Sequence, residues 1–156
     1  MDAHLVVREA TIGDAPTIAE LRIRSAAERH SVSPDDCETF LAAARETFEA
    51  RLRDRSVRVW LAFDGERAVG TATLMFLPTL PRFDVAADRD GRIRNVYVDP
   101  HYRRRGLATL LVSKAIETAK SVHVDRLTLG TSEMGRSVYE RLGFAQKPDE
   151  MIYGEK

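Results

Sequence analysis

The stretch IRNVYVDPHYRRRGLATLL, residues 93–111, decides how this chain folds. Its first six residues, 93–98, are rich in the β-branched and aromatic side chains that are typical of a strand. Asp99-Pro100 then predicts a turn. Beyond three arginines and Gly106, apolar residues recur at helical spacing from Leu107 onward. The stretch therefore predicts a strand, a turn, a cationic glycine loop and a helix, in that order.

This order of elements favours a binding site for a phosphate-bearing ligand. The first turn of a helix offers unpaired backbone N–H groups and the positive end of the helix dipole. Gly106 lets a ligand approach the backbone because it has no Cβ, and Ala108 is nearly as small. Arg103, Arg104 and Arg105 add fixed positive charge and planar donor groups that suit phosphate oxygens. A solvated run of surface charge is the alternative interpretation of the three arginines.

The loop resembles the Arg/Gln-x-x-Gly-x-Gly/Ala loop of the GNAT acyl-CoA-dependent N-acetyltransferases. Here Arg103-x-x-Gly106-x-Ala108 follows the predicted strand at Val96–Val98, where that family carries its fourth strand. A second motif, YERLGF at residues 139–144, is similar to the family's tyrosine-bearing helix that ends in Gly-Phe. One helix and one strand separate the two motifs, as in the family. The resemblance covers most of the chain and implies a single N-acetyltransferase domain over residues 1–156.

The resemblance implies an α/β GNAT-like fold with a mixed, mostly antiparallel sheet, splayed between its fourth and fifth strands and covered by helices on both faces. It also implies acetyl-CoA as co-substrate in that splay, with the pyrophosphate on the glycine loop. The pantetheine amides would pair with the backbone of Val96 and Val98 as an added strand does. The expected cofactor-binding residues are Val96, Tyr97, Val98, Arg103, Arg104, Arg105, Gly106, Leu107, Ala108 and Thr109.

The reaction that the resemblance implies is direct transfer of the acetyl group to a primary amine in a ternary complex. Tyr139 matches the family's candidate general acid, and the alternative is a core tyrosine whose hydroxyl satisfies a backbone group. Many members carry a glutamate base on the fourth strand, but this strand offers Arg94 and Asn95, and neither is a base. Glu133 is a substitute, unless it is only a helix-start carboxylate, and water in an open cleft is another. The base is therefore left open.

Composition bounds the class of protein. A chain of 156 residues with 44% hydrophobic and 31% charged residues is typical of one globular domain. Its 24 basic and 24 acidic residues cancel, so no global field directs it to nucleic acid or to a membrane. The single cysteine, Cys37, excludes an internal disulfide and indicates a reducing, cytoplasmic setting. A homodimer is left open. No metal is expected, because the four histidines lie on separate segments without ligand spacing: His4, His30, His101 and His123.

Elsewhere in the chain, hydrophobic periodicity predicts alternating elements. The order is β-α-α-β-β-β-α-β-α-β, with helices capped at Asp14 and at Gly143. The expected strands are residues 5–10, a half-buried strand 57–63, 68–77, 93–98, a buried strand 126–130, and 151–153. Helices are expected from Asp14 to about His30, from Pro34, from Leu107, and over residues 134–142. Residues 78–92 are expected to form a loop.

The acceptor is where the sequence says least. In the resembled family the first two helices, their connection and the segment between the last two strands grip the acceptor. Carboxylates there would suit a cationic amine, or could be solvated helix-start charges: Asp35, Asp36, Glu38, Asp149 and Glu150. Two other functions remain open, namely a non-catalytic acetyl-CoA sensor or interaction module and a nucleic-acid binder. The zero net charge argues against nucleic acid.

Overall fold

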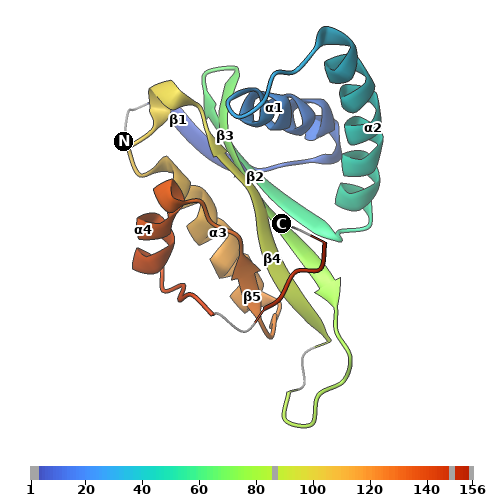
Figure 1. The fold of residues 1–156 in the computed structure, drawn as a ribbon, viewed down its shortest axis with the longest axis vertical. Helices are drawn as coiled ribbons and strands as arrows, with labels where there is room; N and C mark the ends of the chain where they lie inside the picture. The colour runs from blue at the N-terminus through green and yellow to red at the C-terminus, as the bar shows by residue number, and fades with distance from the viewer. Residues whose placement is uncertain (1–3, 86–87, 148–149, 155–156) are drawn as a thin grey trace.

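The fold was analysed in a computed structural model that describes residues 4–85, 88–147 and 150–154 (Figure 1). The described chain has five strands, four α-helices and two short 3₁₀ turns. The elements are β1 (Leu5–Glu9), η1 (Ile12–Asp14), α1 (Ala15–Ala27), α2 (Pro34–Arg53), β2 (Val57–Asp64), β3 (Arg67–Pro78), β4 (Arg89–Val98), η2 (Pro100–Tyr102), α3 (Leu107–Ser121), β5 (Leu127–Leu129) and α4 (Glu133–Arg141).

The five strands form one mixed sheet in the order β1-β2-β3-β4-β5. Neighbouring strands are antiparallel except β4 and β5, which run parallel. Parallel pairing of β4 with β5 covers only Gly91–Ile93 against Leu127–Leu129. From Arg94 to Val98, β4 has β3 on one side and no strand of the described chain on the other. The predicted splay between the fourth and fifth strands is confirmed.

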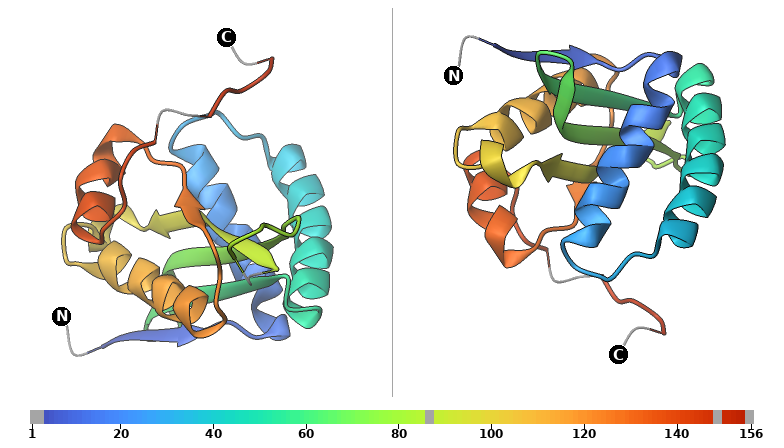
Figure 2. Two further views of the ribbon diagram at one scale, coloured as in Figure 1. Left: turned by 90° about the horizontal axis from the view of Figure 1, so that it is seen from below. Right: turned by 90° about the horizontal axis from the view of Figure 1, so that it is seen from above.

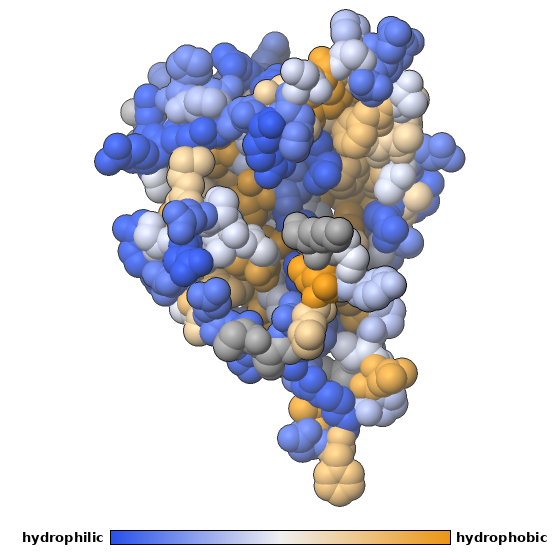
Figure 3. Space-filling model, in the orientation of Figure 1, coloured by the Kyte–Doolittle hydropathy of each residue, from blue (hydrophilic) through white to orange (hydrophobic). Residues whose placement is uncertain are grey.

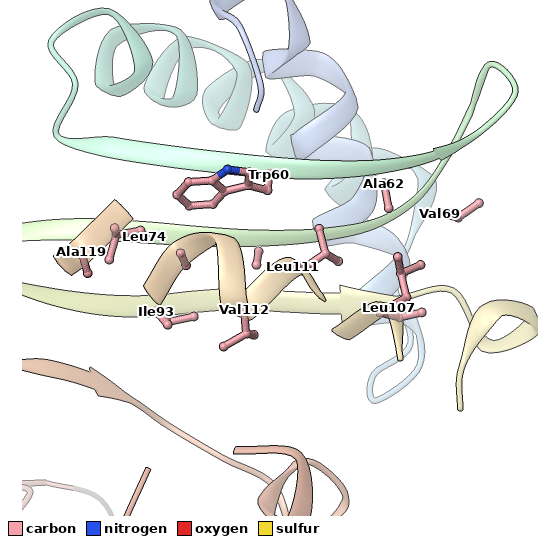
Figure 4. Close-up of a cluster of buried hydrophobic side chains, with 12 residues drawn as sticks. Trp60, Ala62, Val69, Leu74, Ile93, Leu107, Leu111, Val112 and Ala119 are labelled. Atoms are coloured by element: carbon pink, nitrogen blue, oxygen red, sulfur yellow. The ribbon is translucent and has the colours of Figure 1, made fainter. Parts of the chain in front are cut away.

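Helices cover both faces of the sheet, as predicted (Figure 2). On one face, α1 and α2 bury Ile18 and Leu21 against Val59, Leu61 and neighbouring side chains. On the other face, α3 presents apolar residues every three or four positions, the spacing of one helix side. Leu107, Leu111, Val112, Ala115 and Ala119 of α3 are all buried there, together with Trp60, Leu74 and Ile93 of the sheet (Figure 4). The two cores hold the sheet between two helix layers, and α4 packs beside α3.

Several predicted boundaries need correction. The first helix ends at Ala27 rather than near His30, and β4 begins at Arg89, inside the predicted loop. β4 begins early because it forms a long hairpin with β3, and the two strands pair as far as Pro78 with Arg89. The strand over residues 57–63 is buried on both faces instead of one, since helix layers cover both sides. Conversely, β5 is only half-buried along its three residues.

The predicted last strand at residues 151–153 is wrong. Met151, Ile152 and Tyr153 pair with no strand of the described chain, and their side chains are exposed at 99%, 71% and 104%. Residues 150–154 extend away from the body of the molecule (Figure 2). Residues with a strand-like pattern form a strand only where they can pair with a sheet edge. Residues 150–154 do not reach the edge of β5.

Candidate active site

The turn after β4 is fixed by one buried carboxylate. Asp99 is 4% exposed, and its Oδ1 accepts a hydrogen bond from the backbone N–H of His101 (3.1 Å). Its Oδ2 accepts from Arg67 Nη2 on β3 (2.8 Å). Burial by itself would raise the pKa of Asp99, but the bonds from His101 and the charge of Arg67 outweigh it and lower that pKa. The charged carboxylate therefore anchors the point at which the chain leaves the sheet and enters the glycine loop.

The glycine loop leaves the first turn of α3 open. Arg104 and Gly106 both adopt left-handed backbone conformations, with φ of 61° and 78°. The Gly106 carbonyl accepts the first helical hydrogen bond, from the N–H of Leu110 (3.0 Å). No group of the described chain accepts from the N–H groups of residues 107–109. Such a turn, at the positive end of a 15-residue helix, offers the N–H donors and the dipole that favour an anion.

The three arginines of the loop have different surroundings. Arg103 is half-buried and held by hydrogen bonds: its Nε donates to the Val98 carbonyl (2.9 Å), and its Nη2 donates to both carboxylate oxygens of Glu28 (2.8 and 2.6 Å). The Arg105 guanidinium lies over the Tyr102 ring, 5.6 Å from its centroid. Arg104 is exposed and contacts no charged or hydrogen-bonding group of the described chain. The charge of Arg104 is therefore the one most accessible to a bound phosphate.

The part of β4 beyond its pairing with β5 carries a β-bulge against β3. Thr71 pairs with Tyr97 and Thr73 with Arg94, so β4 has one residue more than β3 in this interval. Asn95 takes the strain with a left-handed φ of 54°, which asparagine tolerates better than most residues. Its Nδ2 is buried without a hydrogen-bond partner in the described chain. The bulge turns the strand where the splay begins, and leaves an unsatisfied amide donor there.

Tyr139 lies on α4 and packs against the core on the α3 side of the sheet. Val96 and Ala108 pack against the same core, so residues from β4, α3 and α4 converge there. The Tyr139 ring meets Phe144 edge-on, with centroids 6.2 Å apart. Gly135 leaves room for the ring, because a Cβ there would lie 2.9 Å from Tyr139 Cε2. Partial burial raises the pKa of the Tyr139 phenol. Its hydroxyl has no hydrogen-bond partner among the described residues.

The other predicted residues are dispersed. Tyr97 belongs to the core under α1, on the opposite face from Tyr139, so its ring is remote from α3. Glu133 is the first residue of α4 and is exposed. Asp36 exchanges hydrogen bonds with Ser33 at the start of α2, which is the role of a helix cap. Asp149 lies outside the described residues. Glu28 was missed from the sequence, and nothing local signals its pairing with Arg103, 75 positions away.

Two absences hold for the residues that the structure describes. They contain no group of three or more histidine, cysteine, aspartate or glutamate side chains arranged to hold a metal ion. Their helices also include none with the length and apolar character needed to span a lipid bilayer.

Comparison with known proteins places the fold and both motifs in one family. The sequence profile described as "Acetyltransferase (GNAT) family" matches residues 20–144, which is most of the chain. The chain therefore belongs to the GNAT acetyltransferase family, and acetyl transfer is the general reaction that this membership supports. Acetyl-CoA is the co-substrate that the family uses.

Individual relatives agree with this assignment. Glucosamine 6-phosphate N-acetyltransferase of Trypanosoma brucei brucei is 38% identical over 78 residues, which are 50% of this chain and 51% of that protein. The uncharacterized N-acetyltransferase YedL of Escherichia coli K12 is 27% identical over 100 residues, covering 61% and 57%. The matches thus span only about half the length of these relatives. A predicted acetyltransferase of Clostridium acetobutylicum, solved with acetyl-CoA, has the same fold, with a TM-score of 0.83 over 96% of both chains at 22% identity.

Proposed function

We propose that this protein transfers the acetyl group of acetyl-CoA directly to a primary amine. The observation that carries the proposal is the open first turn of α3, which lies beside the free edge of β4. Those two features offer a phosphate site and a peptide-like edge side by side, as the two ends of coenzyme A require. Family membership and the acetyl-CoA in the solved relative from Clostridium acetobutylicum support the same reading.

In this proposal, the N–H groups of residues 107–109 hold the pyrophosphate. Gly106 admits the ligand, because a Cβ at this position would meet nothing within 4 Å and the space beside the backbone is open. Arg104 supplies charge toward the phosphates. Arg103 contributes indirectly, since it ties the end of β4 to Glu28 and so fixes the loop. The free edge of β4 near Val96 aligns the pantetheine arm. Val98 is less suited to this pairing, because its carbonyl already accepts a hydrogen bond from Arg103.

For the chemical step, the acceptor nitrogen attacks the thioester carbonyl carbon, and the carbon–sulfur bond then breaks. The departing thiolate takes a proton, which Tyr139 donates. A raised pKa keeps this phenol protonated at neutral pH, so it is available as an acid. The amine must lose a proton, for which water or the exposed Glu133 is available. Glu28 is a poor candidate for this role, because both of its carboxylate oxygens accept from Arg103.

An acceptor screen tests the proposal. Acetyl-CoA is incubated with the protein and with aminoglycosides, amino sugars, polyamines, amino acids or peptides, while thiol release is followed and products are weighed by mass spectrometry. We expect release of free CoA that depends on the acceptor, with a product about 42 Da heavier, because an acetyl group replaces one hydrogen atom of the amine. Tight binding of acetyl-CoA with no transfer to any amine would instead favour the sensor or interaction module.

A further inference from the structure

Three arginines lie near one another on the α1 face of the sheet, and none of them is paired with a carboxylate of the described residues. Arg22 lies on α1, Arg29 follows the end of that helix, and Arg94 lies on β4. The charges of Arg29 and Arg94 both act on Arg22, so the three guanidinium groups lie near one another. Arg94 points to this face as well, because neighbouring strand residues alternate and Ile93 packs on the α3 side. We call Arg22, Arg29 and Arg94 the arginine cluster.

The charges of the cluster act on one another. Partial burial lowers the pKa of Arg22, and the nearby positive charges of Arg29 and Arg94 lower it further. Both charged groups that influence Arg22 are arginines. In the described chain, no hydrogen bond or ion pair involves any of the three guanidinium groups. Hydrophilic side chains gather in this part of the surface, between α1 and β4 (Figure 3).

Several other arginines of the described chain are paired with carboxylates, whereas none of these three is. The chain has as many acidic as basic residues, and it pairs arginines with carboxylates elsewhere. Examples are Arg8 with Asp14, Arg58 with Glu9 and Arg67 with Asp99. Glu28 precedes Arg29 in sequence, yet its carboxylate is bound by Arg103. Like charges held together without a partner are unfavourable in the free protein, and a bound anion would relieve that repulsion.

The cluster lies at the entrance to the splay. Ile93 is the last residue of β4 that pairs with β5, and Arg94 is the first one beyond that pairing. The open turn of α3 belongs to the opposite face of the sheet, since α3 packs on the side of Ile93. A cofactor on the α3 loop and an anion at the cluster would therefore approach the splay from different faces. Arg92 adds charge on the cluster's face, with a buried Nε that has no partner in the described chain.

The geometry points to an acceptor that carries an anionic oxygen group, phosphate or carboxylate, besides its amine. This inference rests on the proposed acetyl transfer and names the class of its acceptor. The arginine cluster binds the anionic group with the planar donor groups of its guanidiniums, and so directs the amine into the splay. It differs from the expectation that carboxylates on the first two helices bind a cationic acceptor, and one of these, Asp36, already accepts a hydrogen bond from Ser33, the N-cap of α2.

A binding experiment tests the inference without turnover. Thermal unfolding is measured at constant ionic strength with and without inorganic phosphate, for the wild type, for a variant carrying Arg22→Gln and Arg94→Gln, and for a control. Arg51→Gln is the matched control, because Arg51 is exposed in the last turn of α2. We expect phosphate to raise the Tm of wild type and control more than that of the double variant. Equal increases in all three proteins would overturn the inference, whatever the acetyltransferase activity.

Matched acceptors then identify the anionic group. Glucosamine 6-phosphate is compared with glucosamine, and glycine with glycinamide, as acceptors of each protein. In one of the two pairs, the double variant should have a kcat/KM at least about tenfold below that of the wild type for the anionic member. Its kcat/KM for the neutral member and its KM for acetyl-CoA should match those of the wild type. Comparing variant with wild type cancels the different basicities of the amines. Equal losses within both pairs would overturn the inference, whereas no transfer to any amine would overturn the proposed function instead.

Discussion

Tyr139 combines two properties that an acid for a departing thiolate needs. Partial burial raises the pKa of its phenol, so the proton is retained at neutral pH. The hydroxyl has no partner in the described chain, so it is available to a ligand. A tyrosine that served only packing would normally have its hydroxyl satisfied by a neighbouring group. The sequence predicted the residue through its motif, but burial and the unpaired hydroxyl follow from how α4 packs on the core.

Replacing Tyr139 with phenylalanine tests that role. If Tyr139 donates the proton, kcat should fall by about 10²–10⁴-fold, while the KM for acetyl-CoA barely changes because the hydroxyl acts mainly in the transition state. Stability should change little, since no hydrogen bond is lost. Tyr102→Phe is the control: it removes a hydroxyl that donates to Asp64 (2.5 Å) and should keep kcat. A fully active Tyr139→Phe protein would assign the proton to solvent.

Arg104 provides a second test at this scale. Because it is exposed and has no partner in the described chain, its charge should act on the polyanionic cofactor directly. Arg104→Gln should weaken CoA binding and reduce its dependence on salt, since one attraction that salt screens is gone. If Arg104 contacts the 3′-phosphate, the substitution should weaken the binding of dephospho-CoA less than it weakens the binding of CoA. Calorimetry at two ionic strengths measures both effects, and an unchanged salt dependence would contradict the contact.

At the scale of elements, the strand, loop and helix of residues 93–111 were predicted from sequence because each carries a local signal. Alternating β-branched residues, Asp-Pro, a glycine loop and apolar spacing are properties of neighbouring residues. The bulge at Asn95 has no such signal beyond the tolerance of asparagine for a left-handed backbone. The arginine cluster was missed for a similar reason. It assembles from α1 and β4, and only tertiary packing places Arg94 beside Arg22.

The junction of β1 with α1 shows how a side chain can join two elements. Asp14 was predicted as a helix cap, and it does stand at the start of α1. Its carboxylate, however, accepts from the N–H of Thr11 (2.7 Å) and from Arg8 on β1 (2.8 Å). The hydrogen bonds from Arg8 and Thr11 outweigh the effect of burial and lower the pKa of Asp14 to about 2. The ionised carboxylate therefore stabilises the fold.

Asp14→Asn should accordingly show a pH-dependent loss of stability. The folded-state pKa lies below the ordinary value, so the stabilisation is fully present above about pH 5 and is lost as the pH falls toward 2. By linkage, the shift corresponds to about 2 kcal/mol at neutral pH. Urea unfolding of wild type and variant at pH 7, 4 and 3 measures the difference, which should shrink at low pH. A constant difference across this range would mean that the ionised form of Asp14 is not what stabilises the junction.

For the whole molecule, the order of elements predicted the fold class and the two helix layers, and the resemblance to the GNAT family implied the splay. Prediction from the sequence failed where an outcome depends on distant partners. The run Met151–Tyr153 has strand-like residues but no edge to pair with, and the long β3–β4 hairpin depends on pairing that reaches Pro78 and Arg89. Burial of both faces of β2 likewise follows from the helix layers rather than from its own alternation.

In the proposed reaction, the splay gives the two substrates separate approaches to one reaction centre. The phosphate site at α3 lies toward one face of the sheet, and the arginine cluster lies toward the other. Two substrates can then be bound together without competing for one cavity, as direct transfer in a ternary complex requires. The first of these two sites is the more critical, because every later step needs the thioester positioned from the glycine loop.

Calorimetric titration of acetyl-CoA into wild type and Gly106→Asp tests this site most directly. A side chain at Gly106 meets nothing within 4 Å, so the variant should fold, although its φ of 78° adds some strain. The introduced carboxylate would block the pyrophosphate by bulk and by like charge. Gly65→Asp is the matched control, with a φ of 58° and open space in the β2–β3 turn. We expect affinity to fall at least about tenfold, or about 1.4 kcal/mol, for Gly106→Asp and to be kept in the control. Wild-type affinity in a folded Gly106→Asp protein would contradict the account.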